Sequence, residues 1–290
     1  MMDVLGDESA RRLGRLCEPS LQDAIVAAPP NPGLERIEAR FAADGYDLHR
    51  HDTYAIGLTL HGVQSFWYRG MRRYSLPGNV IVLHPDELHD GSAGTEEGLR
   101  YRMLYLEPSL VLDSLGDVGS LPFVSNPVFA DPAIAAILST ALGNLDEELD
   151  ELLVDDVISR LTQGLARLAR QAVKPVDRPA ARQVALVRDY LEAHALRLVK
   201  SHELEAVSGL DRYTLSRHFR ALYATSPHRF LLMRRLKRAR DMIGMGEPLA
   251  EIAVETGFSD QSHLNRQFKK AFGLTPGRWA ALTGADGIGV

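Results

Sequence analysis

Hydrophobic and polar positions in the last hundred residues follow the same pattern twice. Seven positions recur at an offset of 48 residues up to a glycine and of 49 residues beyond it. The first copy carries Leu204, Gly209, Leu215, Arg217, Phe219, Pro227 and Phe230, and the second carries Ile252, Gly257, Leu264, Arg266, Phe268, Pro276 and Trp279. The apolar residues have helical spacing on both sides of each glycine, which predicts a short helix, a turn and a longer helix in each copy.

The second copy predicts a helix over residues 249–256, with Pro248 where a first-turn proline is tolerated. Gly257 then stands in the position of a left-handed C-cap, and Ser259 or Asp260 is expected to cap the next helix. Its buried side carries Leu264, Phe268 and Phe272, spaced four apart. Its other side carries side chains of the types that contact bases and phosphates, namely Gln261, Ser262, His263, Asn265, Arg266, Lys269 and Lys270.

The first copy repeats this arrangement over residues 203–208, with Ser201 as an N-cap candidate, Gly209 as the turn and Asp211 as the next cap. Its second helix presents Arg212, Tyr213, Ser216, Arg217 and Arg220 outward. A third helix, expected from residue 227 to about residue 242, separates the copies and is rich in cations. We interpret it as a rigid spacer that also contacts phosphate, through cations that include Arg234, Arg235 and Lys237.

The stretch LKRARDMIGMGEPLAEIAVETGFSDQSHLNRQFKKAFGLTPGRW, residues 236–279, resembles the AraC/XylS family of bacterial transcription regulators. The resemblance implies a C-terminal domain of seven helices, whose two helix-turn-helix units enter successive major grooves. Carried over by position, the base-contacting residues are Tyr213, Ser216, Arg217, Gln261, Ser262, His263, Asn265 and Arg266. The predicted phosphate contacts are Arg212, Arg220, Arg234, Arg235, Lys237, Lys269 and Lys270.

Charge divides the 290 residues into two unlike parts. Residues 1–177 hold 15 Lys and Arg against 27 Asp and Glu, a net charge of −12, whereas residues 178–280 hold 18 against 10, a net charge of +8. A basic nucleic-acid module attached to an acidic regulatory module has this asymmetry. The polar, proline-bearing segment 174–180 lies where the sign changes, so we predict an effector and dimerisation domain over 1–173, a linker over 174–180 and a DNA-binding domain over 181–290.

Composition excludes several other classes of protein. The hydrophobic content of 45% and charged content of 24% are ordinary for a soluble protein, and no apolar run reaches 18 residues. The first residues are too polar for a signal peptide, and a single cysteine, Cys17, excludes an internal disulfide. We therefore predict a cytoplasmic protein that does not associate with membranes.

Residues 36–108 show strand patterns instead of helical ones. Apolar or alternating runs at 54–60, 63–69, 80–83 and 99–106, with a Pro77-Gly78 turn, predict a small β-barrel or jelly roll. The segments HRHDTYAIGL and PGNVIVLHPDELHD also resemble the cupin effector domain of AraC-type regulators. The predicted fold class is therefore two-domain α+β, with an N-terminal cupin-like β-barrel, flanking helices, and a C-terminal all-α domain.

A helix is expected to open at Asp131 and Pro132, and a longer one covers residues 145–172. The longer helix has apolar residues near heptad spacing, namely Leu149, Leu152, Leu153, Val157, Leu161, Leu165 and Leu168. This stripe indicates either packing on its own domain or a dimer interface. The resemblance to AraC favours the dimer.

His49, His51 and His89 fall near the positions where metal-binding cupins place ligands. Such cupins use His-x-His, a following Glu and a later His, whereas here Asp52 follows and no Glu lies three or four residues on. Three imidazoles suit a divalent metal. The incomplete pattern nevertheless favours structural or effector-contacting histidines, so we predict neither a metal nor another cofactor.

Arg100 and Arg102 project from the same face of a predicted strand. If that face lines the barrel, they are suited to hold an anionic ligand; if it faces water, they are ordinary surface charges. We therefore include both with the three histidines as candidate effector contacts. Tyr101 and Tyr105 are expected on the other face.

The resemblance implies a sequence-specific transcription regulator controlled by a small-molecule effector, with no enzymatic activity. Its expected partners are double-stranded promoter DNA, the effector, RNA polymerase and a second copy of the chain. One alternative is a metal-dependent cupin enzyme fused to a DNA-binding domain, against which the missing Glu argues. A second is a constitutive regulator without an effector, which ligand-induced thermal stabilisation of residues 1–177 would distinguish.

Overall fold

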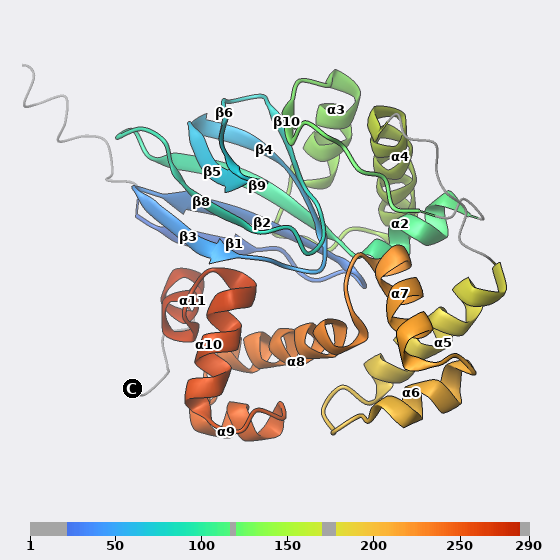
Figure 1. Ribbon diagram of the computed structural model, residues 1–290. Helices are drawn as coiled ribbons and strands as arrows, with labels where there is room; N and C mark the ends of the chain where they lie inside the picture. The colour runs from blue at the N-terminus through green and yellow to red at the C-terminus, as the bar shows by residue number, and fades with distance from the viewer. Residues whose placement is uncertain (1–21, 117–119, 170–177, 285–290) are drawn as a thin grey trace, which may run out of the picture.

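The strands predicted between residues 54 and 106 belong to two antiparallel sheets that face each other (Figure 1). The structure is a computed structural model that describes residues 22–116, 120–169 and 178–284. Within these ranges, the two sheets have the strand orders β1-β2-β9-β4-β7-β10 and β3-β8-β5-β6. The strands are β1 (Ala24–Ala27), β2 (Leu34–Phe41), β3 (Asp44–His49), β4 (Tyr54–Gly62), β5 (Gln64–Tyr68), β6 (Met71–Ser75), β7 (Val80–Leu83), β8 (His89–Ala93), β9 (Leu99–Leu106) and β10 (Val128–Phe129).

The predicted runs coincide with strands of these sheets. Runs 80–83 and 99–106 match β7 and β9, and runs 54–60 and 63–69 end within two residues of β4 and β5. β4 is almost continuously buried because the other sheet covers one face of its sheet and helices cover the opposite face. In the predicted turn, Gly78 adopts a φ of 85°, which glycine tolerates because it lacks Cβ. The prediction of a cupin-like N-terminal barrel is confirmed.

Three helices pack on the outer face of the six-stranded sheet, namely α2 (Pro108–Leu115), α3 (Pro132–Ala141) and α4 (Glu151–Ala169). Asp131 caps α3 as expected, because its side chain accepts two backbone N–H groups of the first turn. From the predicted leucine stripe of α4, Val157, Leu161 and Leu165 are buried in this domain, whereas Leu152 is 80% exposed. The stripe therefore serves mainly for packing within the domain.

The ends of two predicted segments differ from the structure. The helix expected over 145–172 begins at residue 151, and residues 170–172 lie outside the described ranges, as does Cys17. Of the predicted linker, residues 174–177 also lie outside them, and residues 178–180 form the first turn of α5. The helical domain therefore begins three residues earlier than the proposed boundary.

Among the described residues, the C-terminal domain has the seven helices that the resemblance implied. They are α5 (Arg178–Ala193), α6 (Ser201–Ser208), α7 (Arg212–Tyr223), α8 (Pro227–Gly244), α9 (Leu249–Glu255), α10 (Gln261–Phe272) and α11 (Pro276–Thr283). Helices α6 and α7 form the first helix-turn-helix unit, α9 and α10 form the second, and α8 connects them (Figure 1). Each unit contributes to a separate apolar core.

The turns and caps of both units follow from local sequence. Gly209 and Gly257 have φ values of 68° and 77°, a left-handed conformation that reverses the chain after α6 and α9. Asp211 caps α7, and Asp260 rather than Ser259 caps α10 by accepting a backbone N–H group. These short-range contacts end the first helix of each unit and begin the second.

The first residue of α6 differs from its prediction. Ser201 was expected to be the N-cap, but Lys200 occupies that position and Ser201 is the first helical residue. The cause is the Glu203 carboxylate, which accepts the backbone N–H of Lys200 at 2.7 Å and closes the helix one residue earlier.

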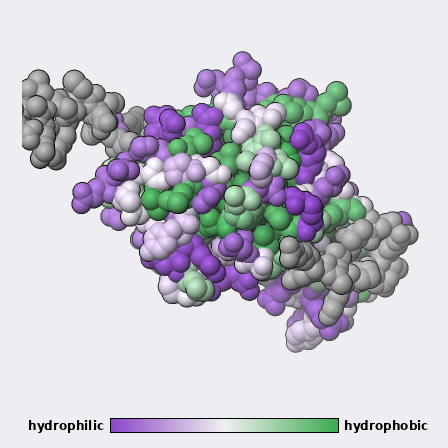
Figure 2. Space-filling view, turned by 90° about the horizontal axis from the view of Figure 1, so that it is seen from above, coloured by the Kyte–Doolittle hydropathy of each residue, from purple (hydrophilic) through white to green (hydrophobic). Residues whose placement is uncertain are grey.

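The two domains pack against each other through α8, α10 and α11, and α7 of the first unit also contacts α2 (Figure 1). The end of α10 lies against β3, α11 lies against β1, and Leu274 and Leu282 are buried in the same apolar cluster as Phe41 of the barrel. Figure 2 looks onto the barrel from above, where hydrophobic residues gather among hydrophilic ones. No helix within the described ranges combines the length and the apolar character needed to cross a membrane.

Candidate functional site

The outward side of α7 carries the DNA contacts predicted for the first unit. Tyr213 is 75% exposed, and Arg212, Arg217 and Arg220 are exposed as well. Ser216 is half-buried. The core residues of α7 lie on its other side, so helical periodicity leaves the polar side accessible to a major groove.

The outward side of α10 exposes three of its five predicted base contacts. Gln261, Ser262 and Arg266 are exposed, whereas Asn265 is half-buried. His263 is also half-buried because its ring packs edge-on against the phenyl ring in the turn before the helix. The base contacts predicted for these five residues remain predictions, and the three exposed side chains are the most accessible to DNA.

Arg266→Ala is expected to weaken binding to the specific DNA site by roughly 1 to 3 kcal/mol and to relax base choice at one position. The reason is that an exposed arginine on a recognition helix can donate two hydrogen bonds to a guanine. The measurement is a binding titration on DNA selected from random pools by the wild-type protein. Equal weakening on selected and random DNA would instead assign Arg266 to a phosphate.

Cations on one side of α8 contact the barrel domain. Arg234 is only 9% exposed and donates to Asp52 at 2.6 Å and to Glu107 at 2.7 Å. Lys237 donates to the same Glu107 at 2.9 Å. We call the polar interdomain contacts among the described residues the docking seam. On the helical side it consists of Arg229, Arg234, Lys237, Arg240, Lys269, Lys270, Gly273 and Arg278. On the barrel side it consists of Asp23, Glu35, Asp44, Asp47, Arg50, Asp52, Asp86 and Glu107.

Both ends of α8 take part in the docking seam. Near its start, Arg229 donates to the Asp86 carboxylate at 2.6 Å and to the backbone oxygen of Arg50 at 2.7 Å. Near its end, Arg240 donates to Glu35 at 2.9 Å. The helix is therefore held to the barrel along most of its length.

The end of α10 joins the docking seam through its backbone. The Asp47 N–H donates to the Gly273 oxygen at 2.9 Å, and the Arg50 N–H donates to the Lys270 oxygen at 3.2 Å. The Lys269 ammonium also lies 2.8 Å from the Asp47 carboxylate, although both side chains are largely exposed. The second recognition helix thus ends directly on strand β3.

Two carboxylates of the docking seam, Glu35 and Glu107, are held ionised at neutral pH. Burial opposes ionisation of Glu35, but Arg240 and Lys237 outweigh it and lower the pKa to about 2. Burial is likewise outweighed at Glu107, where Lys237 and Arg234 lower the pKa to about 2. Because both folded-state pKa values are depressed, the stabilisation is present above about pH 4.5 and is lost as the pH falls toward 2.

The phosphate contacts of Arg234, Arg235 and Lys237 remain predictions, and the structure shows all three side chains engaged within the protein. Arg234 and Lys237 belong to the docking seam. Arg235 donates to the backbone oxygen of Ala195 at 2.8 Å and to that of Gly257 at 3.2 Å. It therefore links the loop before the first unit to the turn of the second.

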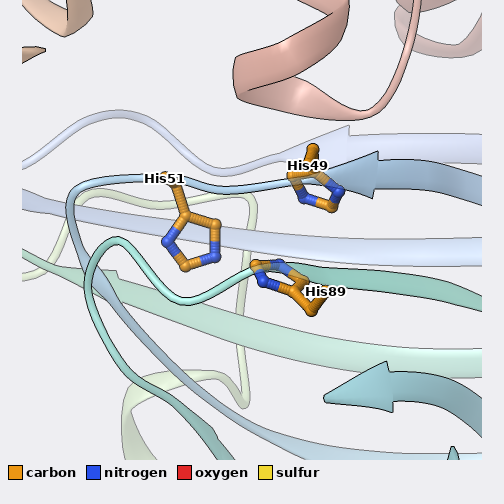
Figure 3. A group of neighbouring side chains, drawn as sticks. All are labelled: His49, His51 and His89. Atoms are coloured by element: carbon orange, nitrogen blue, oxygen red, sulfur yellow. The ribbon is translucent and has the colours of Figure 1, made fainter. Parts of the chain in front are cut away.

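The three histidines singled out in the sequence converge at one edge of the barrel (Figure 3). His49 ends β3 directly opposite His89 at the start of β8, and His51 lies in the turn after β3. The ring centroid of His89 is 4.2 Å from that of His49 and 4.8 Å from that of His51. None is more than 7% exposed.

Burial keeps these three rings neutral. It lowers the pKa of His89 to about 4, and it lowers the pKa values of His49 and His51 well below the usual value. Neighbouring imidazoles add to the effect for His49 and His51, because a second charge nearby is unfavourable. At neutral pH the cluster is therefore a set of neutral nitrogen donors.

Arg100 and Arg102 lie on the outside of the barrel. Arg102 donates to Glu38 at 2.8 Å and to the backbone oxygen of Gly143, just after α3, at 2.8 Å. Arg100 is exposed, and Tyr101 between them is buried between the sheets, as alternation along β9 requires. The contact with an effector inside the barrel that we predicted for the two arginines does not fit this placement.

Sequence comparison connects both domains to known families. An AraC-like ligand binding domain matches residues 31–162, and a helix-turn-helix domain matches residues 204–281. The uncharacterized HTH-type transcriptional regulator YbfI of Bacillus subtilis is 26% identical over 240 residues, which cover 81% of this chain and 87% of YbfI. The HTH-type transcriptional activator RhaS of Escherichia coli is 22% identical over 249 residues, which cover 83% of this chain and 89% of RhaS.

Comparison of structures finds the same two-domain fold in ToxT from Vibrio cholerae. A ToxT crystal structure superposes with a TM-score of 0.63 at 12% identity and covers 87% of this chain and 99% of ToxT. Another ToxT structure, bound to an unsaturated fatty acid, gives a TM-score of 0.61 at the same identity. At such low identity the likeness establishes the fold alone.

A ligand-binding barrel joined to two helix-turn-helix units defines a DNA-binding transcription regulator under the control of a ligand-binding domain. The chain belongs to the AraC/XylS family. This confirms the family, the fold class and the general function that the repeated pattern and residues 236–279 predicted.

The acidic half of the docking seam was missed in the sequence. Glu35 and Glu107 belong to no motif, and Asp52 and Asp86 lie in the two cupin-like segments without having been assigned a role there. The sequence feature that could have revealed these carboxylates was the opposite net charge of the two halves of the chain. We attributed that asymmetry to DNA binding alone, whereas part of the positive charge contacts the barrel.

Proposed function

We propose that this regulator works in the cytoplasm, has no enzymatic activity, and responds to a small molecule by changing how its DNA-binding domain docks on the barrel. The observation that carries this proposal is the docking seam, in which cations of α8 pair with carboxylates of the ligand-binding domain. An effector that prefers one arrangement of the domains shifts the population toward it, and DNA that prefers the same arrangement is bound more tightly.

Two observations support a small organic effector. One is the match of the barrel to an AraC-like ligand binding domain over residues 31–162. The other is the unsaturated fatty acid in the ToxT structure, a protein with the same fold. The crevice beside Arg234 between the domains has room for no more than about one water molecule, so we do not place the effector there. The identity of the effector for this chain is left to a ligand screen.

A homodimer and a contact with RNA polymerase belong to the same proposal. Family membership supports both, since the resemblance to AraC implies them. The surface of the barrel also supports a second copy, because the edge hairpin β5–β6 carries apolar side chains that are 39% to 61% exposed, namely Trp67, Met71 and Tyr74. Paired DNA sites with two half-motifs each, about one helical turn apart, are the expected target.

A fragment of residues 178–290 is expected to fold alone and to bind the selected DNA specifically, though more weakly than the full chain. It keeps both units and has 18 basic and 11 acidic residues, a net charge of +7. Its two apolar cores consist almost entirely of its own residues, and the weaker binding reflects lost avidity. The measurements are circular dichroism, DNA titration and light scattering, which should give a monomer for the fragment and a dimer for the full chain.

The complementary fragment, residues 1–177 with a net charge of −12, serves as the control. It should be stabilised by the effector and should not bind DNA. An effector response by the helical fragment, or promoter recognition by the acidic one, would contradict the assignment of the two roles to the two domains.

A further inference from the structure

The histidine cluster at the end of β3 has its nitrogen atoms arranged as metal ligands are. Each Nδ1 of His49, His51 and His89 lies 2.7 to 2.9 Å from the backbone oxygen of a residue two positions away. A carbonyl oxygen only accepts hydrogen bonds, so each Nδ1 carries the proton and each Nε2 has a free lone pair. Hydrogen bonds of this kind orient the histidines that bind metals in proteins.

His84, another buried histidine of the same domain, shows the contrasting structural arrangement. Its Nδ1 lies 2.8 Å from the Tyr68 hydroxyl, and its Nε2 accepts the Val124 N–H at 2.9 Å. Both of its nitrogens therefore have partners. In the cluster, by contrast, the Nε2 atom of His51 is buried and has no hydrogen-bond partner among the residues that the structure describes.

We propose that His49, His51 and His89 bind one divalent metal ion of the Zn²⁺ class through Nε2, and that the bound ion braces the segment on which the DNA-binding domain docks. Neutral imidazoles are among the preferred ligands of Zn²⁺. One nitrogen from each ring lies within 4.8 Å of the other two. Tetrahedral ligands about 2.0 to 2.1 Å from zinc are roughly 3.3 Å apart, so small ring rotations complete the site.

Three protein ligands leave one coordination position of a four-coordinate ion for another donor. A water or a donor atom of a small molecule fills that position in open zinc sites. The site differs in this respect from closed structural zinc sites, which use four side chains. The proposed metal site is independent of the proposed regulator function, because the contacts of the docking seam do not require a metal.

The turn that carries two of the three histidines also forms the centre of the docking seam. Between these two histidines, the Arg50 N–H donates to the Lys270 oxygen, and the Arg50 oxygen accepts from Arg229. The residue directly after the second histidine, Asp52, pairs with Arg234. An ion held on both sides of Arg50 restricts this backbone and thereby favours the docked arrangement.

Zinc binding by the tag-free full-length chain is the first test. After treatment with a chelator and dialysis, titration with zinc chloride in a calorimeter should give one ion per chain, and Co²⁺ should give the visible absorption of a tetrahedral nitrogen site. His51→Gln and His89→Gln should each weaken zinc binding by at least about 100-fold, the upper range seen for changes beyond the direct ligands. The exposed His61→Gln serves as the control and should bind as the wild type does.

Two results would overturn the metal site. One is a wild-type chain that binds no stoichiometric zinc and gives no tetrahedral Co²⁺ spectrum. The other is a zinc affinity that does not follow the cluster: it stays unchanged in both His51→Gln and His89→Gln when these are folded, or it is lost in the control His61→Gln. Because the Co²⁺ spectrum is recorded on the wild type, the test does not depend on the variants being stable.

Hydrogen exchange with and without zinc tests the brace. In the wild type, zinc should slow exchange of the backbone N–H groups of Asp47 and Arg50, whose hydrogen bonds cross to the end of α10. In His51→Gln, zinc should leave this exchange unchanged. If wild-type exchange at the two positions does not respond to bound zinc, the metal does not support docking and that part of the proposal is wrong.

Discussion

Arg234→Ala is expected to separate the two domains while leaving each of them folded. The substitution removes the ion-pair partner of Asp52, which is only 3% exposed, and one of the partners of Glu107. Removing one member of a buried ion pair typically costs about 3 to 5 kcal/mol, because the remaining charge is left without compensation. This loss falls on the docked arrangement, since both carboxylates belong to the other domain. Small-angle scattering should show a more extended chain, and thermal unfolding should split into two transitions.

Arg238→Ala is the matched control for this prediction. Arg238 lies on the same helix but is exposed, so its removal should change stability by no more than about 0.5 kcal/mol. If Arg234→Ala gives the same scattering profile and the same unfolding transition as Arg238→Ala, the docking seam does not hold the domains together.

Asp52→Asn separates this role of Arg234 from its predicted contact with phosphate. It breaks the same ion pair but keeps the cation on α8. If Arg234 contacts phosphate in the complex with DNA, the slope of log affinity against log salt should fall by about one in Arg234→Ala and stay unchanged in Asp52→Asn. Equal slopes in both variants would restrict Arg234 to the docking seam.

Gly273→Ala is expected to disrupt docking at the other end of the docking seam. Gly273 caps α10 with a φ of 70°, and a Cβ there would lie 2.7 Å from His49 Nδ1 and 2.8 Å from the Asp47 oxygen. The backbone of β3 would have to move away. A left-handed alanine costs about 1 to 2 kcal/mol and overpacking adds about 1 to 3, so we expect the docked form to lose roughly 2 to 5 kcal/mol. Chemical denaturation of the full-length chain measures this loss.

Gly209→Ala provides the control with the same backbone conformation. Gly209 also ends a helix of the C-terminal domain and has a φ of 68°. A Cβ added there would have the Gln183 side-chain nitrogen as its nearest neighbour, 4.0 Å away. Its substitution should cost only the conformational part, about 1 to 2 kcal/mol. If the two alanine variants are equally destabilised, the contact between α10 and β3 contributes nothing to docking. In the 178–290 fragment, which lacks β3, the two alanine variants should be equally destabilised.

Sequence alone determined the elements of this protein where their causes are local. Gly209 and Gly257 turn the chain because they lack Cβ, Asp211 and Asp260 cap the helices that follow them, and apolar residues four apart define the buried sides. Each of these effects acts within about one helical turn, so the two helix-turn-helix units were predictable almost residue by residue. The N-cap of α6 lies one residue earlier than predicted because the Glu203 side chain reaches back and accepts the backbone N–H of Lys200.

Only the tertiary structure decided what the cations of α8 contact. Sequence marked Arg234 as an exposed helix residue beside DNA, but its partners Asp52 and Glu107 lie 182 and 127 residues away along the chain. The sequence grouped His49, His51 and His89 as candidates, but only the β3–β8 pairing showed that His89 lies directly opposite His49. Helical periodicity predicts which residues share one side of a helix, but it does not predict which part of the protein or which partner that side contacts. That depends on how the barrel and the helical domain pack, where distant opposite charges and apolar surfaces become neighbours.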